Sequence, residues 1–89
     1  MDSKRRYRLK SGVQVRKEAF GLLFYDYRGP RLYFVPTKNL IEADFFNGKQ
    51  TAEGLINKIV IRQHQPRKAS RQWVMGVLAQ LEQKGLVHG

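Results

Sequence analysis

Residues 20–35 read FGLLFYDYRGPRLYFV, and this stretch decides the fold. Two apolar runs, 20–25 and 31–35, flank the segment 26–30, whose Asp, Gly and Pro favour a reversal of the chain. The first run is apolar on both alternating faces, as expected for the central strand of a sheet. Pro36 ends the second run because proline has no N–H to donate to a neighbouring strand. The stretch therefore predicts an antiparallel hairpin.

A further strand is predicted immediately before this hairpin. Residues 13–18 alternate Val13 and Val15 with polar side chains, a pattern typical of a half-buried strand. Three short strands joined by tight turns predict an antiparallel meander, in which residues 31–35 form an edge.

Three helices are predicted after the sheet. Asn39, with Glu42 three residues later, is read as the N-cap of a short helix that runs through Phe46 and ends at Asn47-Gly48. Thr51 is read as the N-cap of a second helix, because apolar residues recur behind it on one face at Leu55, Ile56, Ile59 and Val60.

Ser70 is read as the N-cap of the third helix, which a basic loop over residues 62–69 separates from the second. Gly85 is its expected stop. The apolar stripe of this helix comprises Trp73, Val74, Val77, Leu78 and Leu81. The predicted fold is α+β, with an N-terminal three-stranded antiparallel sheet followed by three helices.

The 89 residues contain no linker or repeat, so residues 1–89 are expected to form a single domain with residues 1–8 as a flexible basic arm. The absence of cysteine excludes disulfides and thiolate metal sites. His64 and His88 are isolated, and no phosphate-binding glycine motif occurs. The chain is therefore expected to bind a partner without catalysis, metal or cofactor.

Lys and Arg number 17 against 7 Asp and Glu, a formal net charge of +10. Such a surplus indicates an anionic partner, either nucleic acid or an acidic peptide or protein. No apolar stretch is long enough for a signal peptide or a membrane span, so a soluble, cytoplasmic protein without membrane partner is expected.

DNA binding by a winged helix-turn-helix is one interpretation of these features. Residues 70–80 would form the recognition helix, with Arg67, Lys68, Arg71 and Gln72 meeting DNA. The order of elements disfavours it, because the wing of such proteins usually follows the recognition helix. The predicted helix is also apolar over much of its surface. Nucleic acid is therefore the less favoured partner.

The edge strand 31–35 supports a second interpretation. An apolar, aromatic edge is a template for an added peptide strand. The same residues also fit an ordinary core strand, with the edge covered by the N-terminal arm or by a second copy in a homodimer. Sequence does not decide the parity of the strand, because the pairs Leu32 with Phe34 and Tyr33 with Val35 are both apolar.

Three segments resemble the mycofactocin biosynthesis peptide chaperone family: YRLKSGVQVRKEAFGLLFYDYRGPRLYFV at 7–35, Phe46-Asn47-Gly48, and residues 78–87. The most specific part is GLLFYD at 21–26 followed by Gly29-Pro30. That family belongs to the winged-helix-like peptide-recognition-element class, which also contains the pyrroloquinoline quinone biosynthesis chaperone.

The resemblance implies a non-catalytic chaperone that binds the acidic leader region of a ribosomally synthesised precursor peptide. The chaperone would present that peptide to a radical S-adenosylmethionine (SAM) enzyme in redox-cofactor biosynthesis. In this class the leader adds as a strand beside the third strand, in the groove next to the last helix. The arm at residues 4–6 is either a solvated tail or an extra contact to the leader. Carried onto this chain, the peptide-binding residues are Arg31, Leu32, Tyr33, Phe34 and Val35 on the strand, and Arg71, Trp73, Val74, Val77 and Leu78 on the helix.

Overall fold

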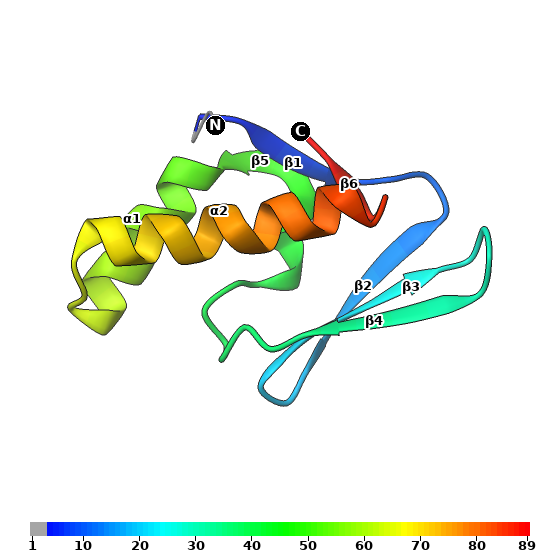
Figure 1. Ribbon diagram of the computed structural model, residues 1–89, viewed down its shortest axis with the longest axis horizontal. Coiled ribbons are helices and arrows are strands. Elements are labelled where there is room, and N and C mark those ends of the chain that lie inside the picture. The colour runs from blue at the N-terminus through cyan, green and yellow to red at the C-terminus, as the bar shows by residue number, and fades with distance from the viewer. Residues whose placement is uncertain (1–3) are drawn as a thin grey trace.

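The computed structural model describes residues 4–89, which form two small sheets, one 3₁₀ turn and two α-helices (Figure 1). Along the chain the elements are β1 (Arg6–Leu9), β2 (Val13–Glu18), β3 (Gly21–Asp26), β4 (Arg31–Val35), η1 (Ala43–Phe46), β5 (Asn47–Thr51), α1 (Ala52–Gln63), α2 (Arg67–Gln83) and β6 (Val87–His88).

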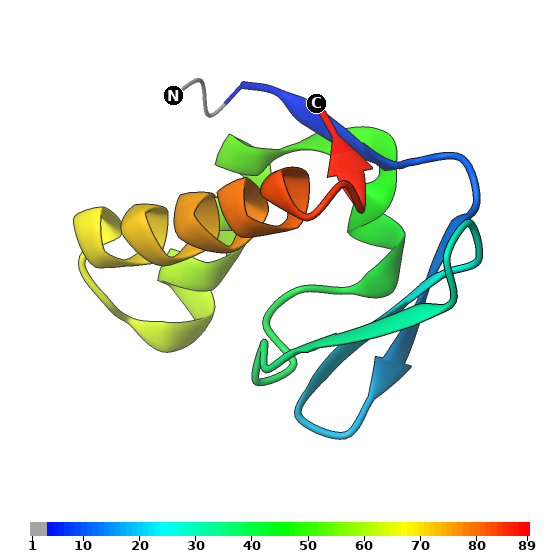
Figure 2. The same cartoon turned by 45° about the vertical axis from the view of Figure 1, so that its right-hand side comes forward.

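The strands form two antiparallel sheets of three strands each, in the orders β2-β3-β4 and β5-β1-β6. In Figures 1 and 2, α2 runs between them, with β1 and β6 on one side and the β2-β3-β4 sheet on the other. The chain from β4 to η1 passes below α2 in both views. The predicted meander is confirmed, with β3 central and β4 at an edge.

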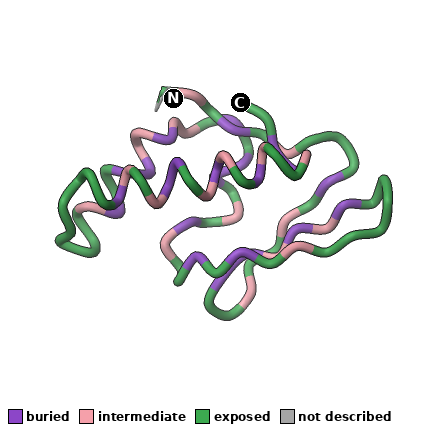
Figure 3. Tube along the Cα trace, viewed as in Figure 1, coloured by how far each residue is buried: buried purple, intermediate pink, exposed green. Residues whose placement is uncertain are grey.

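The inner face of the β2-β3-β4 sheet carries its core residues. Leu22 and Phe24 of β3 are completely buried, and the Phe24 ring packs edge-on against Phe46 with centroids 5.4 Å apart. Tyr7 of β1 packs against Phe45, with centroids 6.3 Å apart. The burial trace in Figure 3 shows buried residues alternating with intermediate ones along β3. The 3₁₀ turn η1 thus joins the two sheets through adjacent aromatic rings.

Gly21, at the start of β3, leaves room for the Phe34 ring of the neighbouring strand. A Cβ atom at Gly21 would lie 2.7 Å from Cζ of Phe34 and would also collide with the carbonyl oxygen of Val35. We therefore expect Gly21→Ala to lower the free energy of unfolding by about 1–3 kcal/mol, measured by urea denaturation. Gly29→Ala is the control, because no atom lies within 4 Å of a Cβ there. Equal stability of the two variants would contradict this packing.

The predicted helix from Asn39 through Phe46 is wrong. Asn39 has φ 61°, whereas an N-cap has extended backbone, and only Ala43–Phe46 are helical, as a 3₁₀ turn. Glu42 occupies the N-cap and makes no side-chain capping bond. The helix does end at Asn47, as predicted, and the chain continues directly into β5.

The prediction for Thr51 is confirmed, since its Oγ1 accepts a hydrogen bond from the N–H of Gly54 at 3.1 Å. The prediction for Ser70 is wrong: α2 starts at Arg67, directly after Pro66, and Ser70 lies inside it. Most of the predicted loop 62–69 is therefore helical, and only residues 64–66 connect α1 with α2. Gly85 follows the end of α2 with φ 74°, as expected for a helix stop.

The β5-β1-β6 sheet was not predicted, so the description of a single sheet and three helices is wrong. Residues 6–8 of the predicted flexible arm belong to β1. Arg5 forms an ion pair of 2.8 Å with Glu82, and its guanidinium lies 5.1 Å from the ring centroid of Tyr7, so the alternative of a solvated tail does not hold for Arg5. The part of the arm at residues 1–3 lies outside the described residues.

Candidate functional site

The two edges of the β2-β3-β4 sheet differ in charge. The β2 edge, VQVRKE, carries three charged side chains, which discourage pairing with another strand. The β4 edge, RLYFV, carries only Arg31, and its residues Leu32 and Phe34 have 66% and 45% of their surface exposed. The β4 strand is therefore the edge better suited to accept an added strand.

One hydrogen bond shows in which direction the backbone N–H and C=O groups of this sheet point. The N–H of Tyr27 donates to the carbonyl of Gly12 at 2.8 Å, and these residues extend the β2–β3 register that pairs Val13 with Asp26. In an antiparallel ladder, hydrogen-bonded pairs alternate with non-hydrogen-bonded pairs. The backbone groups of Asp26 therefore point away from β2 and toward β4.

The same alternation determines which groups of β4 are available. Asp26 pairs with Arg31, so Arg31, Tyr33 and Val35 bond inward to β3. The N–H and C=O groups of Leu32 and Phe34 consequently point to the open edge. This result settles the parity that the sequence left open.

Along α2, a stripe of side chains faces this edge. Trp73, Val77, Gln80 and Lys84 follow one another three or four residues apart, the spacing that places residues on one side of a helix. The Tyr33 hydroxyl donates to Oε1 of Gln80 at 3.5 Å, and Nζ of Lys84 lies 4.7 Å from the Tyr33 ring centroid. The side chain of Tyr33 thus joins β4 to the C-terminal half of α2.

Two pockets lie along this stripe. Near its C-terminal end, a pocket of about 190 Å³ is lined by Arg31, Leu32, Tyr33, Lys84 and Leu86. Toward the start of α2, a second pocket of about 240 Å³ is lined by Lys38, Leu40, Ile59, Gln63, Gln65, Ser70 and Trp73. The stripe with its two pockets is called the α2 groove below.

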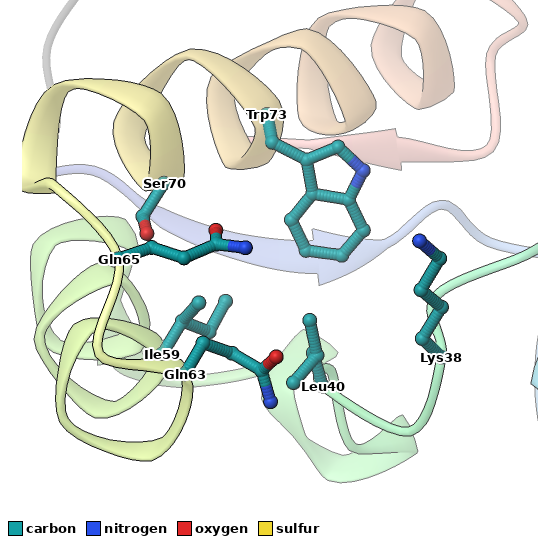
Figure 4. Close-up of a pocket in the computed structure, with 7 residues that line it drawn as sticks. All are labelled: Lys38, Leu40, Ile59, Gln63, Gln65, Ser70 and Trp73. Carbon is teal, nitrogen blue, oxygen red and sulfur yellow. The ribbon is translucent and has the colours of Figure 1, made fainter.

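Figure 4 shows the second pocket, with the Trp73 indole hanging from α2 above Leu40 and the Lys38 side chain beside it. Ser70, only 2% exposed, borders this pocket, and its Oγ has no hydrogen-bond partner among the described residues. The pocket therefore combines an aromatic wall with a buried hydroxyl whose hydrogen-bonding capacity is unused among the described residues.

A buried carboxylate holds the hairpin tip against α2. Only 4% of the Asp26 side chain is exposed, and it accepts hydrogen bonds from Nε and Nη2 of Arg28 at 2.9 and 3.1 Å and from Nη2 of Arg31 at 2.6 Å. Nη2 of Arg28 also donates to the carbonyl of Gly85 at 2.7 Å, and Nη2 of Arg31 to that of Lys84 at 3.3 Å. We call this set the Asp26 cluster.

The hydrogen bonds from Arg28 and then Arg31 hold the pKa of Asp26 well below its usual range, although desolvation opposes them. The carboxylate therefore stays ionised at neutral pH and keeps both guanidinium groups oriented toward the last carbonyls of the helix region. The Asp26 cluster thereby sets the separation between β4 and the end of α2.

The structure distributes the predicted site residues over four environments. Arg31, Leu32, Tyr33 and Phe34 lie at the open edge or facing α2, and Trp73 and Val77 lie half-buried on the groove. Val35, Val74 and Leu78 are buried in the core, with exposures of 7%, 0% and 0%. Arg71 lies about 160° around the helix axis from Trp73, at about 100° per residue, and so points away from the groove.

Sequence reasoning missed several residues of the groove, Lys38, Leu40, Ile59, Gln80 and Lys84, and from the Asp26 cluster it missed Asp26 and Arg28. The helical period counted from Trp73 would have found Gln80 and Lys84, because both are compatible with the same face. No sequence signal marks Lys38 or Leu40, whose positions depend on the path of the chain after β4.

Trp73 is the only tryptophan of the chain and lies half-buried at the pocket. We expect its fluorescence to change when a peptide enters the groove. Trp73→Ala should remain folded, because part of the ring is already exposed, and should weaken peptide binding by about tenfold, measured by calorimetry. Val77→Ala is a milder control on the same face. Two results together would instead identify Trp73 as an ordinary core residue: Trp73→Ala unfolds, and addition of peptide leaves the fluorescence of the parent protein unchanged.

Within residues 4–89, no group of three or more His, Asp or Glu side chains is placed to hold a metal ion. Neither α1 nor α2 has the length and apolar character that a membrane crossing requires.

The fold and the site define a small α+β protein with an unpaired strand edge beside a partly apolar helix face, an arrangement that modules binding extended peptides use. A family model described as the peptide chaperone MftB family matches residues 6–88, and the chain belongs to this family. This is the mycofactocin chaperone family, whose role is that of a peptide chaperone in mycofactocin biosynthesis. Comparisons with curated proteins and with solved structures found no match.

Proposed function

We propose that the chain binds the leader region of a ribosomally synthesised precursor peptide by strand addition to β4 and presents it to a radical SAM enzyme. The observation that carries this proposal is the open edge of β4, where the backbone groups of Leu32 and Phe34 point outward beside the α2 groove. Membership of a peptide chaperone family supports a peptide as the ligand and a modifying enzyme as the second partner.

The added strand forms main-chain hydrogen bonds with Leu32 and Phe34 in this proposal, and its inward side chains enter the α2 groove. Main-chain bonds supply affinity without regard to sequence, whereas the two pockets supply preference for particular side chains. An acidic leader is complementary to the net charge of +10. The chain itself performs no chemistry in this role.

The test is binding of the mycofactocin precursor peptide in competition with duplex DNA. We expect the peptide to bind with micromolar or tighter affinity, and random duplex to compete only weakly and less at higher salt. Both ligands are anionic, so salt dependence alone does not separate them. A duplex site bound about 1000-fold more tightly than random DNA, and displacing the peptide, would contradict the proposal and favour the DNA-binding alternative.

A further inference from the structure

Residues 4–89 leave largely uncovered the face of the β2-β3-β4 sheet that points away from the core. Side chains alternate along β3, so Leu23 and Tyr25 lie opposite the buried Leu22 and Phe24. The register places Phe34 beside Leu23 and Leu32 beside Tyr25 on the same side. We call these four side chains, together with Tyr27, the outer face.

The outer face exposes large aromatic and aliphatic side chains to solvent. Leu32 is 66% exposed, Tyr27 63% and Phe34 45%. The rings of Tyr25 and Tyr27 stack with centroids 6.1 Å apart, and a concavity of about 290 Å³ lies between these rings, Pro30 and Leu32. A contiguous exposed patch of aromatic and aliphatic side chains marks an interaction surface.

We propose that the outer face is the surface that docks the modifying enzyme, an inference that rests on the proposed function. The backbone groups of Leu32 and Phe34 point to the open edge of β4, where the peptide would add, and their side chains point to the outer face. A peptide strand added to β4 therefore extends the outer face by one strand, and its own outward side chains lie about 5 Å further on. An enzyme seated there contacts both chaperone and peptide.

The other side of the added strand faces the α2 groove and is closed to a large partner. The stripe of α2 and the side chain of Tyr33 already occupy that side. The outer face is thus the surface from which an enzyme reaches the bound peptide without displacing it.

Charge distinguishes this occupant from a second copy of the chain. Arg16 lies on the outer face, because it pairs with Leu23, and more than half of its side chain is exposed; its ion pair with Glu18 leaves this face with little net charge of its own. A second copy would nevertheless bring together two chains that each carry a net charge of +10, and this repulsion disfavours self-association. The complementary occupant is a protein that offers an apolar patch and carries a net negative charge.

The test uses the double variant Tyr25→Thr/Tyr27→Asn, with the single variant Tyr27→Asn as a safeguard because this turn residue is exposed. Thr suits a strand and Asn suits a turn, so both proteins are expected to fold. Neither position lies on β4, so the peptide edge is preserved. Ile61→Gln is the matched control, since Ile61 is 73% exposed on α1, outside the outer face.

We expect the double variant to bind the purified radical SAM enzyme at least about tenfold more weakly, by calorimetry, while its affinity for the precursor peptide changes less than about twofold. Tyr27→Asn should show a smaller loss, and Ile61→Gln none. Unchanged enzyme binding by a folded, peptide-binding double variant overturns the inference. A parent that sediments as a dimer and a variant that sediments as a monomer would assign the face to a second copy and also overturn it. A parent that binds enzyme but no peptide would refute the proposed function separately.

Discussion

Phe34→Pro is expected to abolish peptide binding in a folded protein, whereas Tyr33→Pro is expected to destabilise the fold itself. The N–H of Tyr33 bonds inward to β3, and proline removes that donor and restrains the strand, at a cost of about 3 kcal/mol. The N–H of Phe34 points to the open edge, where proline removes a donor that only an added strand would use. Neighbouring positions should therefore respond in opposite ways.

Urea denaturation and calorimetric titration with the precursor peptide separate the two effects. Tyr33→Pro should unfold at lower urea, and Phe34→Pro should unfold near the parent midpoint but lose at least about 100-fold in affinity, because the added strand also loses its register. Phe34→Ala is the control for the aromatic side chain, since it retains the N–H. A folded Phe34→Pro that binds as tightly as the parent would place the peptide elsewhere.

Asp26→Asn is expected to produce the second large effect, loss of stability together with loss of affinity. The carboxamide has nearly the same shape but no charge, and its NH₂ group would face the guanidinium donors of Arg28 and Arg31. Without the carboxylate, those side chains no longer hold the carbonyls of Lys84 and Gly85, and the α2 groove loses its fixed width. We expect a lower melting temperature and several-fold weaker peptide binding.

The contribution of Asp26 should also appear in the pH dependence of stability. Its pKa in the folded protein lies below the unfolded value of about 3.9, so the stabilisation is complete above about pH 5 and is lost as the pH falls below about 4. Asp26→Asn should lack this component of the acid-induced decrease in melting temperature. Glu18→Gln is the control, because its ion pair with Arg16 is exposed. An identical acid profile for parent and Asp26→Asn would exclude the cluster as a stabilising unit.

The local patterns of the sequence were sufficient for the β2-β3-β4 meander and for α1. Alternation, turn residues and Pro36 act between neighbours in the chain, so the bounds of β4 and the central place of β3 follow from them. Thr51 caps α1 through a bond to a residue three positions away, which is equally local. The apolar edge of β4 was predictable for the same reason.

Only the tertiary structure decided the second sheet, the parity of β4 and the composition of the site. Strands β1 and β6 are short and lie at opposite ends of the chain, and their pairing depends on contacts that no local pattern encodes. Both faces of β4 are apolar, so its parity is seen only in the folded sheet, where Arg31 pairs with Asp26, Val35 is buried, and Leu32 and Phe34 are exposed. Asp26 belongs to the segment whose sequence predicted only a turn, and it is buried because Arg28 and Arg31 of the folded hairpin neutralise it against the end of α2. Apolar periodicity encodes which residues leave water, whereas the partners that they meet are determined by packing between distant segments.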